Sequence, residues 1–119
     1  MATIFVFRQS NTYEPLILVP FDENNAVVDL SGATSPVIRV ALTVAPFTVI
    51  VNDVTCEILT NQVVDGVTRA FVFRYYFTLT QSNSDPGDYG ATVTVTIGGR
   101  LLTFPTQTNF PIKIIAKIP

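Results

Sequence analysis

The sequence predicts an all-β fold, an antiparallel β-sandwich of about seven to nine strands in a single domain over residues 1–119. Three observations predict it. Segments rich in Val, Ile, Thr, Phe and Tyr recur along the chain, separated by clusters of Pro, Gly and Asn. Polar and apolar residues alternate within several segments, as in strands with one buried face. No segment has the periodicity of a convincing helix, and the length suffices for one hydrophobic core without disulfides.

Each expected strand lies between turn-forming residues. In chain order, we expect strands near Thr3–Arg8, Tyr13–Val19, Val37–Val44, Phe47–Val51, Val54–Leu59, Thr68–Leu79, Tyr89–Ile97, Leu101–Phe104 and Ile112–Ile118.

Three connections indicate their own geometry. Gly98-Gly99 predicts a two-residue hairpin, because both glycines adopt positive φ without a Cβ clash. Asp65-Gly66 predicts a second hairpin of this kind, and the polar Asp22–Asn25 stretch predicts a turn after the second strand. The last third of the chain is therefore expected to be antiparallel.

Alternation indicates which faces are buried. In the strand that begins at Tyr89, the odd-numbered residues to Ile97 are apolar, and Gly90 and three threonines alternate with them. In the 68–79 segment the inner face is expected to hold Phe71, Phe73, Tyr75, Phe77 and Leu79.

Four apolar residues are predicted to contact a partner. Val72 and Tyr76 lie on the outer face of the 68–79 strand, which is unusually apolar for a face in water. Phe5 and Phe7 belong to a first strand that is apolar on both faces, opposite Ile4 and Val6. For Phe5 and Phe7, ordinary core packing is an equal alternative.

The stretch NSDPGDYGATVTVTI, residues 83–97, predicts a structural corner formed by Asp85, Gly87 and Tyr89. In immunoglobulin-like sandwiches, a tyrosine near the start of strand F hydrogen-bonds to the backbone a few residues upstream. The sandwich is therefore expected to be immunoglobulin-like. Antibody domains have a cysteine two residues after this tyrosine, where this chain has Ala91, and the chain has no tryptophan. The similarity is thus to the wider immunoglobulin-like group.

Three motifs in order resemble the small immunoglobulin-like domains of tailed-phage virion proteins, such as the N-terminal domain of upper baseplate proteins and the capsid decoration or cement proteins. They are V-D-L-S-G-A at 28–33, P-G-D-Y at 86–89 and T-F-P at 103–105. The resemblance covers most of the chain. Baseplate proteins of this kind usually continue into trimerising segments, whereas this chain stops after a strand, which favours a decoration subunit.

The resemblance implies a non-enzymatic virion structural protein that stabilises the shell through contacts with neighbouring coat subunits. The expected partners are the major capsid protein or tail and baseplate subunits, together with self-association into a homo-oligomer. A tail, baseplate or neck adaptor is one alternative. A carbohydrate-binding module for host adhesion is another, with Tyr13, Tyr75 and Tyr76 as its available aromatic residues.

Composition excludes several other classes. Seven Lys and Arg against nine Asp and Glu give a net charge of −2, so nucleic acid is not an expected partner. The longest apolar region, VIRVALTVAPFTVIV, is interrupted by Arg39 and Pro46 and is too short to span a bilayer, so no membrane is expected either. Charged residues make up 13% of the chain, about half the usual fraction, as suits a protein packed against neighbours. The N-terminus has no signal-peptide pattern, which predicts synthesis in the host cytoplasm and residence in the virion.

No catalytic residue, cofactor or metal site is expected. The chain has no histidine, which excludes Ser-His-Asp and Cys-His arrangements and the usual zinc ligands. Cys56, the only cysteine, is interpreted as a small buried hydrophobe on one face with Val54 and Ile58. Asp22-Glu23 and Asp85/Asp88 could supply oxygen ligands to calcium, but solvated turns are the preferred interpretation.

Overall fold

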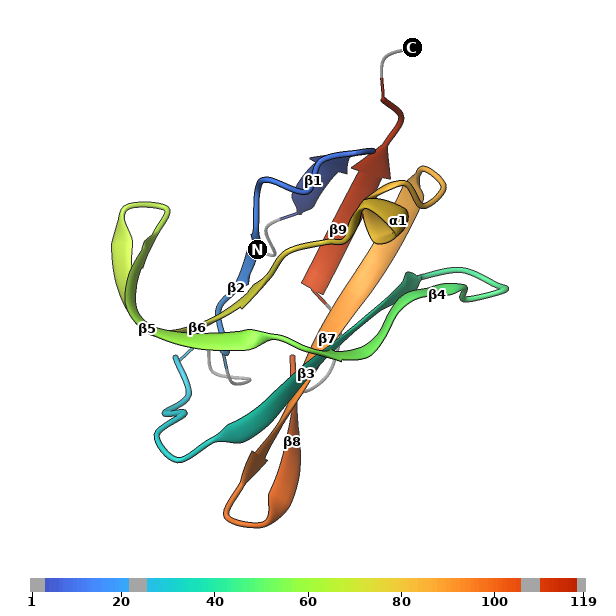
Figure 1. Cartoon of the computed structure of the whole chain (residues 1–119). Helices are drawn as coiled ribbons and strands as arrows, with labels where there is room; N and C mark the ends of the chain where they lie inside the picture. The colour runs from blue at the N-terminus through green and yellow to red at the C-terminus, as the bar shows by residue number, and fades with distance from the viewer. Residues whose placement is uncertain (1–3, 22–25, 106–109, 118–119) are drawn as a thin grey trace.

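The computed structural model describes residues 4–21, 26–105 and 110–117. Two sheets pack against each other in these residues (Figure 1), so the prediction of an all-β sandwich is confirmed. The elements are β1 (Phe5–Arg8), β2 (Leu16–Leu18), β3 (Thr34–Leu42), β4 (Val49–Thr55), β5 (Glu57–Val64), β6 (Val67–Tyr75), α1 (Leu79–Ser82), β7 (Gly87–Ile97), β8 (Arg100–Phe104) and β9 (Phe110–Ile115).

The larger sheet has six strands in the order β1-β9-β7-β3-β4, with β8 also paired to β7. The long strand β7 is its centre: β3 lies along one side, and β9 and then β8 share the other side. The smaller sheet has the order β2-β6-β5. These orders correspond to strands G-F-C-C′ and B-E-D of immunoglobulin-like sandwiches. Antiparallel pairing was predicted; β1 and β9 are the exception, because they pair in parallel.

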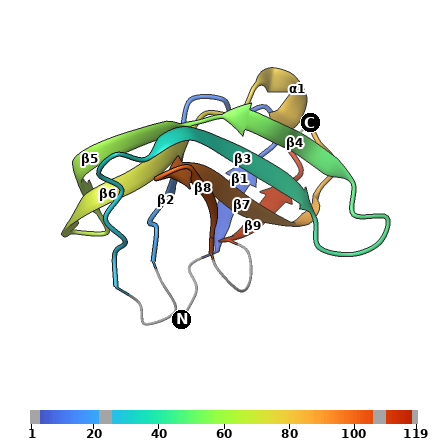
Figure 2. The same ribbon diagram turned by 90° about the horizontal axis from the view of Figure 1, so that it is seen from below.

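One stretch of chain passes from one sheet to the other. β4 belongs to the larger sheet and β5 to the smaller one, and only Cys56 separates them. Figure 2 shows β4 and β5 as one continuous green ribbon across the molecule. The amide of Cys56 donates to the carbonyl of Pro36 (3.0 Å), which anchors this passage. The two strands expected at 47–51 and 54–59 are thus longer than predicted and divide at the sheet crossing.

Both predicted hairpins are confirmed. β7 and β8 turn through Gly98 and Gly99, whose φ values are 57° and 78°. β5 and β6 turn through Asp65 and Gly66, at φ values of 51° and 78°. Positive φ at both central positions defines the type I′ turn, whose twist matches that of the flanking strands. The turn expected at 22–25 lies outside the described residues.

The core lies between the sheets and follows the predicted alternation. On β7, Tyr89, Ala91, Val93 and Val95 are buried, while the threonines between them are partly exposed. The largest fully buried side chains are those of Tyr89, Phe73, Phe104, Leu16, Leu18, Ile38, Ile112 and Ile114. Residues from both sheets therefore form one core.

The segment after β6 differs from the prediction. The strand expected to reach Leu79 ends at Tyr75, and one helical turn, α1, begins at Leu79. Thr78 and Gln81 form a capping box: the Thr78 hydroxyl accepts from the Gln81 amide, and the Gln81 side chain accepts from the Thr78 amide. Leu79 consequently leaves the inner face on which it was expected and is exposed. Among the described residues, no helix has the length and apolar character of a membrane span.

Candidate functional site

The first of the predicted contact residues, Phe5 and Phe7, face inward. They pair in register with Ile112 and Ile114 of β9, both of which are buried in the core. Phe7 is 5% exposed, and its ring packs edge-on against Phe77 with the ring centroids 5.2 Å apart. Phe5 is half-buried and packs against the core. The prediction of a partner contact is therefore corrected for Phe7, which is a core residue.

Val72 also requires a correction. Its side chain is fully buried although it lies on the face of β6 opposite Phe73. β6 is the middle strand of the smaller sheet, and Leu59 on β5 lies directly beside Val72. A residue on the outer face of the middle strand is thus fully buried in this fold. Val72 is not available to a partner.

Tyr76 is the predicted contact residue with the most accessible side chain, at 43% exposed. The guanidinium of Arg74 lies over its ring, 5.4 Å from the centroid. Arg74 is itself held by Glu57, directly opposite on β5, through two hydrogen bonds of 2.9 Å. Those hydrogen bonds lower the pKa of Glu57. Tyr76 is therefore a positioned aromatic group on an accessible surface.

The larger part of the accessible apolar surface was not predicted as contact surface. In the described part of the chain, Leu101 is 75% exposed at the β7–β8 hairpin and Val63 is 70% exposed at the β5–β6 hairpin. At the first strand, Ile4 and Val6 are exposed, on the face opposite to the predicted Phe5 and Phe7. The exposed large apolar side chains are Ile4, Val6, Tyr13, Val44, Phe47, Val49, Val54, Val63, Val67, Tyr76, Leu79 and Leu101. They are spread over both sheets and both hairpin ends.

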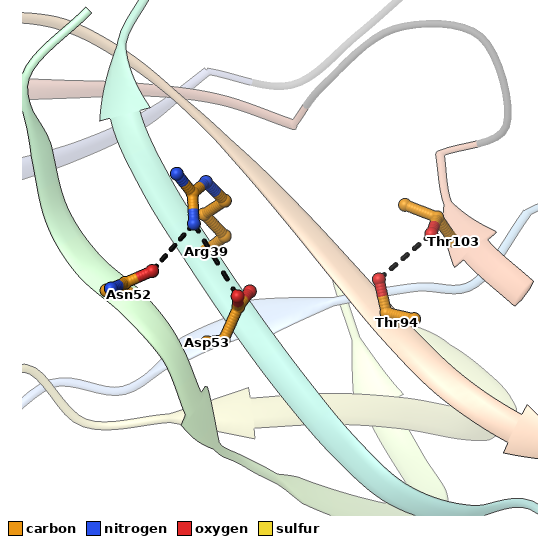
Figure 3. A network of polar contacts seen from close by, with 5 residues as sticks. All are labelled: Arg39, Asn52, Asp53, Thr94 and Thr103. Atoms are coloured by element: carbon orange, nitrogen blue, oxygen red, sulfur yellow. Dashed lines mark hydrogen bonds and ion pairs between the residues drawn. The ribbon is translucent and has the colours of Figure 1, made fainter. Parts of the chain in front are cut away.

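A polar cluster occupies the outer face of the larger sheet (Figure 3). Arg39 Nη1 donates to Asn52 Oδ1 at 2.6 Å and lies 3.5 Å from a carboxylate oxygen of Asp53. The pairing of β3 with β4 shifts register between Ile38 and Val40, where two steps on β3 face three on β4. This bulge, with Asp53 at a φ of 52°, brings both Asn52 and Asp53 against Arg39.

Threonines cover the neighbouring part of that face. The hydroxyls of Thr94 on β7 and Thr103 on β8 are 2.9 Å apart (Figure 3). Next to them, a shallow depression of about 320 Å³ forms where the small residues Ala41 and Gly90 lie opposite each other. It is lined by Arg39, Ala41, Leu42, Thr43, Phe47, Gly90 and Thr92. This surface can form hydrogen bonds and apolar contacts with a protein, and the charge of Arg39 within it is paired with Asp53.

The corner residues have the expected geometry. The hydroxyl of Tyr89 donates to the main-chain carbonyl of Asp85 at 2.6 Å, and the Tyr89 side chain is buried at the start of β7. Burial is the main cause that raises the pKa of Tyr89, so the hydroxyl keeps its proton and remains a donor. Gly87 is the first residue of β7. This stretch is a structural corner of the fold, as the tyrosine-to-backbone contact shows.

The three tyrosines considered for sugar binding do not form one binding surface. Tyr75 is buried, and its hydroxyl donates to Gln81 Oε1 at 2.6 Å. Tyr76 follows the end of β6 and lies beneath the guanidinium of Arg74, the neighbour of Tyr75 that faces the other side of the strand. Tyr13 is exposed on the loop between β1 and β2. Tyr75 is thus unavailable to a ligand, and Tyr75 and Tyr76 do not share a surface.

The acidic residues considered for calcium also lack support in the described residues. No group of three or more Asp, Glu, His or Cys side chains comes together there. Asp85 and Asp88 are exposed at the corner, and Asp22-Glu23 lies outside the described residues.

Cys56 is buried at the sheet crossing, and Val54, expected on the same face, is exposed. Burial raises the pKa of the Cys56 thiol from 9.0 to about 12. A thiolate is the reactive form, and at pH 8 only about one thiol in ten thousand would be ionised. The native thiol is therefore inert packing.

We expect the Cys56 thiol to lower the free energy of unfolding as the pH rises above 9. Above pH 9 the unfolded chain loses the thiol proton while the folded chain keeps it until about pH 12. The folded state then binds more protons, so this group lowers stability by about 1.4 kcal/mol per pH unit as the pH rises through that window. Urea unfolding at several pH values measures it, with Cys56→Ala as the variant that should show a shallower decline. Rapid labelling of the native thiol at pH 8, as fast as in urea, would contradict the burial.

Comparison of the chain with protein-family models, with curated proteins and with solved structures gives no match. The fold alone therefore defines the class: a two-sheet β-sandwich with a tyrosine corner and a surface that is rich in accessible apolar groups.

Proposed function

We propose that this chain is a non-enzymatic structural subunit of a tailed-phage particle, a capsid decoration or cement protein that stabilises the shell by contacting neighbouring coat subunits. The observation that carries the proposal is the surface. Accessible apolar side chains lie on both sheets and at both hairpin ends, while only 13% of the residues are charged. Such a surface suits a protein that is covered by neighbours in its working state.

The distribution of the apolar groups supports contact with more than one neighbour. Leu101 and Val63 belong to hairpins of different sheets, and Val6 lies on a third element, β1, which Ile4 directly precedes. In Figure 1 the β5–β6 and β7–β8 hairpins leave the body of the molecule in different directions. A subunit that bridges adjacent coat subunits needs contacts on separate sides, and repetition over a shell makes modest contacts effective.

The three motifs that resemble phage virion domains have structural roles here. In the first, Leu30 is buried in the core and Asp29 accepts a hydrogen bond from the Ser31 amide at 2.8 Å. In the others, Tyr89 closes the corner and Phe104 is fully buried. The motifs thus support the type of fold, and the surface supports the assembly role.

The experiment that tests the proposal is binding of the purified chain to phage heads that lack it, read by cosedimentation and particle imaging. We expect regular, saturable occupancy of the shell and a higher temperature of genome release from occupied heads. The matched control is the same measurement on isolated tails. Occupancy of tails without occupancy of heads would replace the decoration role by that of a tail, baseplate or neck adaptor. Absence of binding to both would overturn a virion role.

A further inference from the structure

β1 ends the larger sheet, and among the described residues β9 is its only neighbouring strand. One hydrogen bond shows which residues of β1 direct their backbone N–H and C=O groups at β9. Arg8 pairs with Ile115, and the amide of the next residue, Gln9, donates to the Ile115 carbonyl at 2.9 Å. Odd-numbered residues of β1 therefore direct their backbone groups at β9. Even-numbered residues, Ile4, Val6 and Arg8, direct theirs away from the sheet.

Three other sheet edges carry features that block strand addition. β4 has two register shifts and the positive φ of Asp53. β5 has Asn61 at a φ of 53° near its middle. β2 has three residues and lies between Pro15 and Pro20. An added strand would lose hydrogen bonds along each of them.

β8 is the remaining edge strand, and only two of its residues direct their backbone groups outward. The pair Ile97–Arg100 closes the two-residue hairpin, so it is a hydrogen-bonded pair. Hydrogen-bonded and non-hydrogen-bonded pairs alternate along the two strands, so Thr96–Leu101 and Thr94–Thr103 are non-hydrogen-bonded pairs. The outward-facing residues are consequently Leu101 and Thr103, and the next one, Pro105, has no N–H.

β1 is also short, with four residues, but it has no positive φ, register shift or proline. Its outward residues all carry an N–H, and no residue from 4 to 9 has positive φ. Ile4 and Val6 are 61% and 55% exposed on the outer face of the sheet. The Arg8 carbonyl is already used, because it accepts from the Asn11 amide at 3.1 Å. The groups left for a partner are both groups of Val6, the N–H of Arg8 and the C=O of Ile4.

We propose that two copies of this chain pair edge to edge through β1, antiparallel, about a two-fold axis beside Val6. Val6 of each copy then donates to and accepts from Val6 of the other. Arg8 of each copy donates to the Ile4 carbonyl of the other. The two larger sheets become one continuous sheet, and the symmetry closes the assembly at two copies.

A second copy fits this edge because its available groups match their own two-fold image. In this register Arg8 lies opposite Ile4 of the other copy, so the two arginines do not face each other. Each Arg8 side chain also donates to the Ala116 carbonyl of its own chain at 3.0 Å, which holds the charge away from the axis. Val6 packs against Val6 across the axis, and Ile4 packs against the aliphatic part of Arg8.

The contact is small, so it is weak in dilute solution. A short edge buries less than the roughly 1,000 Å² expected of a stable interface. We therefore expect a dissociation constant on the order of 0.1–1 mM. This inference does not rest on the virion role, since it is measured on the purified chain alone.

The test is sedimentation equilibrium and amide NMR of the purified chain up to about 1 mM. We expect the mean mass to rise from 13.0 kDa toward twice that value, and the Val6 amide signal to shift with concentration. Val6→Pro removes an N–H that β9 does not use, so it should keep the fold and abolish association. The Val6 amide of the unmutated chain gives an answer even if this variant fails to fold.

Val6→Lys and Leu101→Lys form the matched pair, because both put the same charge in place of an exposed apolar residue on an edge strand. We expect Val6→Lys to remain monomeric and Leu101→Lys to associate like the unmutated chain. A chain that is monomeric at 1 mM overturns the proposal, and so does association that survives both Val6 variants. Loss of association in Leu101→Lys alone would assign the contact to β8 and equally overturn it.

Discussion

Replacement of Phe73 by alanine is expected to lower the free energy of unfolding by about 3–5 kcal/mol. Phe73 lies on β6 of the smaller sheet and is 1% exposed. Its ring packs against that of Phe104 on β8 of the larger sheet, with the centroids 5.8 Å apart. The substitution thus removes a contact between the sheets and leaves a cavity that the surrounding strands fill only in part. A domain of this size is stable by about 5–15 kcal/mol, so much of that stability would be lost.

Urea unfolding followed by circular dichroism measures this effect. Phe47→Ala is the matched control: it removes the same ring from an exposed loop position, where we expect a change within about 0.5 kcal/mol. A loss for Phe73→Ala as small as the one expected for Phe47→Ala would mean that the core does not depend on the ring of Phe73.

The second large effect is expected for Val72→Asp. Val72 is fully buried within the smaller sheet, so the new carboxylate would lose its water shell. Burial of an unpaired charge is among the few single changes that cost more than about 3 kcal/mol. We expect a protein that is largely unfolded or poorly soluble at neutral pH.

Val63→Asp on the adjacent strand β5 provides the comparison, since Val63 is 70% exposed. Its stability should change by no more than about 0.5 kcal/mol. A Val72→Asp variant that folds normally and fails only to bind other proteins would restore Val72 as a contact residue.

Local chemistry made part of the fold predictable. Gly98-Gly99 and Asp65-Gly66 fix their hairpins because the turn type needs positive φ and these residues supply it. The burial of alternate residues on β7 was also predictable, because a strand with one apolar and one polar face buries the apolar face.

Features that depend on distant residues were not predictable. Alternation placed Val72 opposite Phe73 correctly, but it does not say whether neighbouring strands cover that face. The direction in which β1 faces is set by its pairing with β9, more than a hundred residues along the chain. Without that pairing, Phe7 and Val6 are equivalent candidates for the interior.

A local signal was present for one missed element. Thr78 and Gln81 have the spacing of a capping box, which predicts a helix start at Leu79. The run of aromatic and β-branched residues before it obscured this signal. The exposure of Leu101 and Val63 near the hairpin ends had no such local signal, because Ile97 and Val64, directly beside the same turns, are partly buried.

The sparse charge of the surface also bears on the rate of the proposed assembly with coat subunits. Electrostatic attraction between complementary charged patches raises association rates far above about 10⁵–10⁶ M⁻¹s⁻¹. On the outer face of the larger sheet, Arg39 is paired with Asp53, so the fields of these two charges largely cancel at a distance. We therefore expect association with a coat subunit to depend only weakly on ionic strength. In the proposed role, the occupancy of the shell would then depend mainly on how long each bound molecule stays.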